Sequence, residues 1–121
     1  MLALGVGMSS SALHADLREV VGTVLAEAGW EWDEVAVVGT TRRLAQDQRL
    51  VRLGPRLLGF DRRDLEAVAV PSRPSSIARR LLVPPVAEAA ALLAAGTGSR
   101  ILVPKRAGRY VTVAAAVGGG R

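Results

Sequence analysis

Short apolar runs and one helical stripe alternate along the first third of the chain. Residues 2–6 and 35–38 are apolar stretches closed by glycine, a pattern typical of buried strands. Between them, apolar residues recur from Asp16 at three- and four-residue intervals until Gly29, which predicts an amphipathic helix. Strand, helix and strand in this order favour an α/β layer fold.

The middle of the chain mixes shorter elements with turn residues. A polar-faced helix is expected over residues 44–53, and residues 56–60 are short and apolar enough for a third strand. Asp61, with an acid three residues later, predicts a helix that runs through Val68. The prolines within residues 71–75 then interrupt regular structure, because each proline fixes its own φ and restricts its predecessor.

The last third of the chain predicts helices followed by a pair of strands. A short helix is expected over residues 75–82, and a second one, built almost wholly of alanine, between Pro85 and Gly96. Residues 100–104 and 110–117 are expected to pair as a hairpin around Ala107-Gly108. That hairpin adds an antiparallel strand to an otherwise parallel sheet.

Together these elements predict a three-layer α/β sandwich. Its mixed, mostly parallel sheet is expected to have about five strands and to end in the carboxy-terminal hairpin. Residues 1–117 are expected to form a single domain, and residues 118–121 a disordered tail. A chain of 121 residues is long enough for one such domain.

The charge balance narrows the class of partner. The formal net charge is +5, from fifteen arginines and one lysine against eleven acids. Such a balance suits a polyanion, either nucleic acid or a small molecule rich in carboxylates or phosphates, although coding bias toward arginine and alanine gives the same balance. The four aromatic residues have no spacing suited to stacking bases, which argues against nucleic acid.

Residue types that are rare in the chain exclude further classes. The chain has no cysteine, which excludes disulfides and thiolate metal sites and fits a reducing compartment. His14 is the only histidine and has no ligand pattern around it, so no protein metal site is expected. We expect a cytoplasmic protein without a membrane partner, because the amino terminus has no cleavage pattern and the longest apolar run is short.

Two segments near the ends of predicted strands carry candidate ligand contacts. Gly5-Val-Gly7, followed by Ser9 and Ser10, would let backbone N–H groups surround an anion, or would form an ordinary strand-to-helix turn. Thr40 follows the second predicted strand, at the edge where open α/β sheets bind ligands. A hydroxyl that stabilises the turn is the alternative for Thr40.

The carboxy-terminal third carries three more candidates. Glu88 is the only charged residue of the alanine-rich helix, and it suits a general base or a first-turn carboxylate favoured by the helix dipole. Lys105 is the only lysine, which favours a specific need for an ammonium group over a solvated hairpin residue. Thr112 is a candidate contact that β geometry also explains.

The amino-acid sequences of these segments resemble those of the cobalamin-biosynthesis family called CobE, which is also the carboxy-terminal domain of CbiG. The resemblance covers essentially the whole chain and is strongest after Pro74. The matching segments are Gly5-Val-Gly7, Gly39-Thr40, Pro74-Ser75, Val-Ala-Glu88-Ala-Ala-Ala-Leu92, Leu102-Val-Pro-Lys105 and Thr112-Val-Ala114.

The resemblance implies a role in assembling the corrin ring of vitamin B12. Full-length CbiG looks like the enzyme that opens the δ-lactone of cobalt-precorrin-5A and releases acetaldehyde. We therefore expect this chain to bind, and in the catalytic interpretation to convert, a precorrin or cobalt-precorrin intermediate. The residues that the resemblance points to are Glu88 for catalysis and Gly5, Gly7, Ser9, Ser10, Thr40, Lys105 and Thr112 for substrate binding.

The alternative function is that of a non-catalytic carrier, which holds a corrin intermediate for another enzyme of the pathway. Departures from the family pattern favour it: Leu44 stands at the position of a lysine, Asp47 at that of a glutamate, and Pro85 at that of a serine. No cofactor is expected beyond cobalt carried by the ligand. The exposed end of the sheet is compatible with a homodimer.

Overall fold

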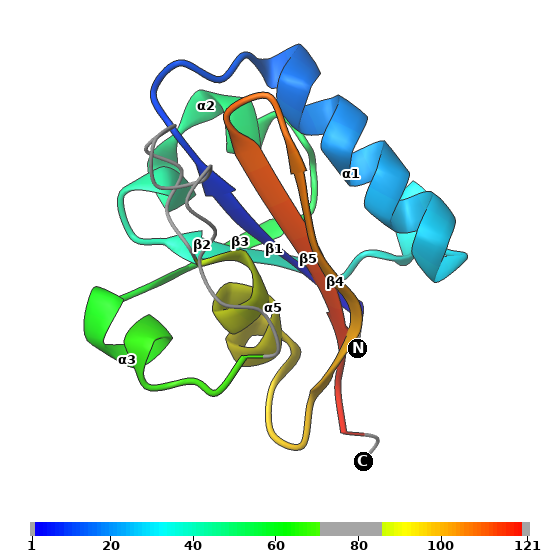
Figure 1. The fold of residues 1–121 in the computed structure, drawn as a ribbon, viewed down its shortest axis with the longest axis vertical. Coiled ribbons are helices and arrows are strands. Elements are labelled where there is room, and N and C mark those ends of the chain that lie inside the picture. Colours follow the sequence, from blue (N-terminus) through cyan, green and yellow to red (C-terminus); the bar gives the residue numbers. More distant parts are fainter. Residues whose placement is uncertain (1, 71–85, 120–121) are drawn as a thin grey trace.

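The structure is a computed structural model that describes residues 2–70 and 86–119 (Figure 1). Five strands form one sheet in the order β3-β2-β1-β5-β4. They are β1 (Leu2–Met8), β2 (Val37–Thr41), β3 (Arg56–Phe60), β4 (Arg100–Gly108) and β5 (Val111–Val117). The first three strands pair in parallel, whereas β5 pairs antiparallel with both β1 and β4. Four of the five strands therefore run in one direction, and the predicted mixed sheet is confirmed.

Helices cover both faces of this sheet (Figure 1). On one face lie α1 (His14–Ala28) and α2 (Gln48–Val51), and on the other lie α5 (Ala87–Ala95) and α3 (Arg62–Glu66). Two short 3₁₀ turns, η1 (Trp32–Glu34) and η2 (Leu44–Gln46), flank β2. The arrangement is the predicted three-layer α/β sandwich.

The face under α1 is built from large aliphatic side chains. Leu17, Val21 and Val24 of α1 pack against Leu4 and Val6 of β1, all of them fully buried. Side chains that interdigitate in this way separate the helix axis from the sheet by the usual thickness of a hydrophobic layer.

The face under α5 is built from alanine and glycine. A Cβ added to Gly5 would collide with the backbone carbonyl of Ala87, and one added to Gly39 would lie 2.5 Å from the carbonyl oxygen of Ala90. Gly5 and Gly39 are register partners on β1 and β2, so they form one small depression in the sheet. The helix backbone consequently lies directly on the sheet backbone.

The amino-terminal elements start or stop at different residues from those predicted. β1 continues to Met8, so Gly5 and Gly7 lie inside a strand and not in a strand-to-helix turn. The predicted helix over residues 44–53 is interrupted at Asp47, whose side chain accepts a hydrogen bond from the Arg49 backbone N–H and so caps α2. One continuous helix would have required Asp47 in a helical conformation, which competes with that cap.

The hairpin also turns two residues later than predicted. The turn is Arg109-Tyr110, because β4 extends through Gly108, which pairs with Val111. Tyr110 adopts a left-handed φ of 62°, a conformation that favours glycine and that no sequence rule assigns to tyrosine. The Ala107-Gly108 pattern therefore predicted the wrong two residues for the turn of the hairpin.

Some predictions concern residues beyond the described ranges. The helix expected over residues 75–82, the Pro74-Ser75 motif and Pro85 all lie outside them. Of the expected tail, Gly119 lies against Gly98, while residues 120 and 121 are not described.

Candidate binding site

The carboxyl ends of the parallel strands place several of the predicted residues at one edge of the sheet. Ser9 follows β1 directly, Thr40 lies near the end of β2, and Thr112 pairs with Gly7 near the end of β1. Open α/β sheets bind ligands at this edge, outside the carboxyl ends of their strands. The register therefore brings Ser9, Thr40 and Thr112 to the same edge of the sheet.

The two threonines point to opposite faces of the sheet. Side chains alternate along a strand, and Gly39 faces α5, so Thr40 faces the α1 layer, where its hydroxyl donates to the Val6 carbonyl oxygen at 2.8 Å. Thr112 lies on the α5 face with Ala114, and its hydroxyl is 3.5 Å from the Gly7 carbonyl oxygen. Both hydroxyls are buried, and the one of Thr40 stabilises the β1–β2 pairing from within.

Glu88 and Lys105 are brought together by an irregularity in β4. Val103 pairs with Ala115 and Arg106 with Val113, so two residues, Pro104 and Lys105, face a single residue of β5. This bulge removes the Lys105 N–H from the regular ladder, and it donates to Oε2 of Glu88 at 3.0 Å. The buried carboxylate of Glu88 thus ties the first turn of α5 to the edge strand.

The surroundings of Glu88 are set by the close approach of α5 to the sheet. Ala87, the residue before it, lies over Gly5, and its carbonyl oxygen occupies the space that a side chain on Gly5 would need. The structure therefore gives Gly5 a packing role beneath the helix that carries Glu88. Gly7 lies on the same face two residues further along β1, beside Thr112.

Ser9 and Ser10 belong to a loop that is held by groups missed in the sequence. The Ser9 side chain accepts a hydrogen bond from the Ser11 backbone N–H, and Ser10 is exposed. The N-cap of α1 is Leu13, so the serines precede the helix without capping it. Nη1 of Arg49 donates hydrogen bonds to the carbonyl oxygens of Ser9 and Ala12 in this loop. The ion pair between Arg49 and Asp47 was not predicted, because nothing in the spacing of these two residues distinguishes them from solvated surface charges.

The departures from the family pattern also have structural roles. Leu44 is 1% exposed and packs in the core beneath α1, so this position is apolar in the fold of this chain. Asp47 caps α2 and forms an ion pair with Arg49 at 2.6 Å. Hydrogen bonds from the Arg49 side chain lower the pKa of Asp47, and the same contact raises the pKa of Arg49.

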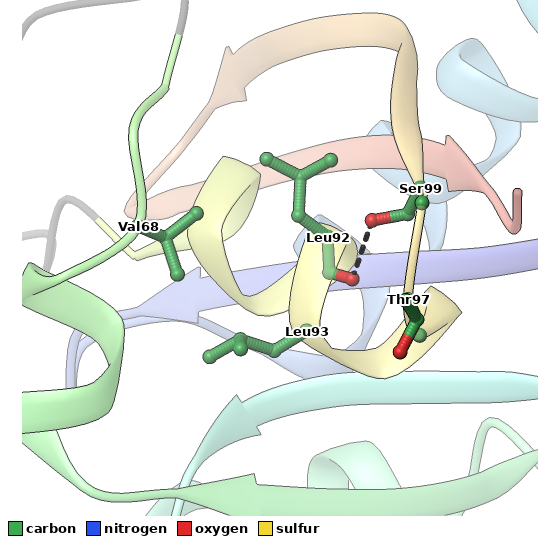
Figure 2. Close-up of a pocket in the computed structure, with 7 residues that line it drawn as sticks. Val68, Leu92, Leu93, Thr97 and Ser99 are labelled. Atoms are coloured by element: carbon green, nitrogen blue, oxygen red, sulfur yellow. Dashed lines mark hydrogen bonds between the residues drawn. The ribbon is translucent and has the colours of Figure 1, made fainter.

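A separate pocket of about 460 Å³ lies at the opposite end of α5 from Glu88. Figure 2 shows Leu92, Leu93 and Val68 around it, with the Ser99 hydroxyl donating to the Leu92 carbonyl oxygen at 2.8 Å. Glu88 and Gly96 are eight residues apart, which is roughly 12 Å along a helix. None of the predicted site residues lines this pocket.

The described residues have neither a metal-binding cluster nor a membrane-spanning helix. Within residues 2–70 and 86–119, no group of three histidine or acidic side chains is arranged to hold a metal ion. In the same part of the chain, no helix has the length and apolar character needed to cross a membrane.

The sheet order and the helices on both faces define an open-sheet α/β domain, and several candidate residues lie at the carboxyl ends of its strands. The family model for the cobalamin synthesis G carboxy terminus matches residues 2–116. The chain therefore belongs to this family of cobalamin biosynthesis proteins. No curated protein sequence matches it.

Three solved structures are similar to the chain. Cobalamin biosynthesis protein ChiG from Agrobacterium tumefaciens is 26% identical with a TM-score of 0.74, covering 99% of this chain and 100% of that one. CobE, from the cobalamin pathway, is 24% identical with a TM-score of 0.71 over 96% and 92% of the two chains. A cobalamin biosynthesis protein G homolog from Sulfolobus solfataricus is 19% identical with a TM-score of 0.73; the match covers 95% of this chain and 36% of that one.

Proposed function

We propose that this chain binds a precorrin or cobalt-precorrin intermediate at the carboxyl edge of its sheet, on the α5 face. The observation that carries the proposal is the buried Glu88 carboxylate, fixed by the backbone of the Lys105 bulge, in a chain of a cobalamin biosynthesis family. Peripheral acetate and propionate groups make such a ligand polyanionic, which suits the net charge of +5.

The residues of this face have complementary roles in binding. The Lys105 ammonium is suited to pair with a ligand carboxylate as a flexible point charge. Gly7 and its register partner Thr112 are both buried, so we expect them to shape the sheet beneath the ligand rather than to contact it. Thr40 faces the other layer and contributes by stabilising β1 and β2 rather than by contact.

A catalytic role would place lactone opening at Glu88. In that reaction the carboxylate takes a proton from water, the water oxygen adds to the lactone carbonyl, and the ring C–O bond breaks to leave a carboxylate and a hydroxyl group. Acetaldehyde release would then follow as a measurable second product.

The carrier interpretation is favoured by one specific observation. Glu88 already accepts a backbone hydrogen bond and Thr40 is bonded within the fold, so these groups have structural duties independent of a substrate. A domain that only holds a corrin intermediate needs groups that bind the ligand carboxylates, such as the Lys105 ammonium, but no general base.

Titration of the chain with cobalt-precorrin-5A, followed by absorbance and by an assay for acetaldehyde, separates these functions. A spectral change with acetaldehyde supports lactone opening, and a spectral change without a new product supports the carrier. Uroporphyrin, which shares the carboxylate-rich periphery but not the corrin shape, serves as the control for charge alone. Absence of any spectral change with the corrin intermediate would rule out both functions.

Variants locate the binding face. Lys105→Ala is expected to weaken binding, whereas Arg100→Ala, on the same strand but at the other end of the sheet, is the matched charge control. Equal affinities of the two variants would contradict the placement at the α5 face.

A further inference from the structure

The strongest unassigned feature is the convergence of loop carbonyl groups on one arginine. Nη1 of Arg49 donates to the carbonyl oxygens of Ala12 at 2.6 Å and Ser9 at 3.1 Å, and lies 3.5 Å from that of Ser10. These three oxygens belong to the loop between β1 and α1, which carries the candidate contacts Ser9 and Ser10. A single guanidinium therefore fixes most of the loop backbone from a different element, α2.

Arg49 is itself held in place by Asp47. Its Nε and Nη2 donate to the two carboxylate oxygens at 2.8 and 2.6 Å, the two-point geometry that only a guanidinium provides. Both side chains are about a quarter exposed or less, so the pair is shielded from solvent more than a surface ion pair. The orientation of Arg49 toward the loop is thus set before any ligand binds.

Two further contacts hold the same loop. The Ser9 backbone N–H donates to the carbonyl oxygen of Tyr110 at 3.0 Å. Among the described residues, Tyr110 is the one non-glycine residue with a positive φ. Nδ1 of His14 lies 2.8 Å from the Arg49 carbonyl oxygen, which joins α2 to the first residue of α1. The left-handed conformation of Tyr110 is unfavourable for a residue with a side chain, and it persists where the surroundings enforce it.

We propose that Arg49 is a positioning residue, which holds the Ser9–Ala12 loop in the conformation that meets the ligand. The inference rests on the proposed corrin-intermediate site, because it assigns Arg49 a role in the affinity of that site without contact to the ligand. It explains why an ion pair on α2 reaches across to the loop after β1. Pre-ordering a loop in this way avoids paying its ordering entropy on binding.

The first test measures the loop in the free protein. Hydrogen exchange at the Ser9, Ser11 and Ala12 amides, which bond within the loop or to Tyr110, is compared between wild type, Arg49→Ala and the control Arg52→Ala. Arg52 is exposed at the end of the same helix. We expect faster exchange in Arg49→Ala alone, while amides in the middle of α1 keep their wild-type rates. Unchanged exchange at the loop amides would overturn the inference.

Chemical rescue separates positioning from a general loss of stability. Free guanidinium at low millimolar concentration, far below denaturing levels, is expected to occupy the space left in Arg49→Ala and to slow loop exchange again. Arg49→Lys keeps the charge but not the two-point contact with Asp47, and is expected to exchange at an intermediate rate. A variant that guanidinium does not restore would indicate a merely structural arginine.

The second test measures binding of cobalt-precorrin-5A by absorbance. Arg49→Ala is expected to bind about tenfold more weakly, with guanidinium restoring the affinity. Equal affinity of wild type and Arg49→Ala overturns the inference alone, since the site itself still binds. If the wild-type chain does not bind, the proposed function fails and the role of Arg49 in ligand binding fails with it, whereas the exchange experiment still reports what orders the loop.

Discussion

The two faces of the sheet are packed by different means. Under α1, side chains such as Leu17 and Val21 fill the space between helix and sheet. Under α5, Gly5 and Gly39 let the helix backbone rest on the strand backbone. A layer of side chains adapts to substitution by small shifts, whereas two backbones in contact have no freedom to adapt. The candidate site lies on the second face, where the position of Glu88 is set most rigidly.

The largest expected effect comes from breaking the backbone contact. Gly5→Val forces α5 away from β1, since the new side chain would collide with the Ala87 carbonyl and no flexible side chain can yield. We expect a loss of at least about 4 kcal/mol in the free energy of unfolding, measured in urea. Gly22→Ala is the control: it lies in α1 with open space around it and is expected to stabilise the chain by up to about 1 kcal/mol. Similar losses in both variants would contradict the comparison.

On the α1 face, substitutions are expected to cause smaller losses of unfolding free energy, which increase with the side-chain volume removed. Leu17→Ala leaves a cavity in a fully buried site and is expected to cost about 3 kcal/mol. Leu17→Met keeps the volume and is expected to cost less than about 1.5 kcal/mol. Urea unfolding of the two variants checks this ordering, and a Met variant as damaged as the Ala variant would show that this face is as rigid as the other.

Within the site, substitutions of Glu88 and of Lys105 are expected to differ in their effect on the stability of the fold. Glu88→Ala leaves the Lys105 N–H without its carboxylate partner and is expected to cost about 2 kcal/mol. Glu88→Gln retains an acceptor and separates stability from any catalytic role. Lys105→Ala keeps the backbone N–H that binds Glu88, so its loss of stability is expected to be smaller than that of Glu88→Ala, while ligand binding weakens. A large loss of stability in Lys105→Ala would show the lysine side chain to be structural.

The smallest expected effect is a pH dependence on the α1 face. Arg49 lowers the pKa of Asp47 in the folded state. The ion pair therefore stabilises the fold at pH values above 3.8, the usual pKa of an aspartate, and this contribution is lost as the pH falls through the lower folded-state pKa. Asp47→Asn retains a capping side chain but carries no charge. The difference in unfolding free energy between wild type and this variant is therefore expected to be present near neutral pH and to shrink in acid. A difference that is constant with pH would contradict this assignment.

The sequence predicted the elements that depend on local patterns. The stripe ending at Gly29 gave the correct end of α1, and the third strand was predicted at its observed bounds, Arg56–Phe60. The helix has an apolar stripe that stops at Gly29, and the strand is a short apolar run between Gly54-Pro55 and Asp61, so neighbouring residues alone define both segments. The mixed sheet followed from their order and from the terminal hairpin.

What the sequence could not predict depends on contacts between distant residues. The bulge at Pro104-Lys105 arises from the register of β4 on β5, and its link to Glu88 spans seventeen positions. Arg49 contacts a loop 37 to 40 positions earlier in the chain. Spacing within one segment has no information about such contacts, which is why Lys105 and Glu88 were predicted singly and Arg49 was missed.

The bulged edge strand also limits how the sheet can grow. Two register shifts interrupt β4, and Pro104 offers no N–H to a neighbour. An incoming strand from another molecule would meet an uneven row of donors and acceptors and could not extend the ladder in register. The irregularity that holds Glu88 thus also protects this side of the sheet from the edge-to-edge aggregation to which a regular nine-residue strand would be open.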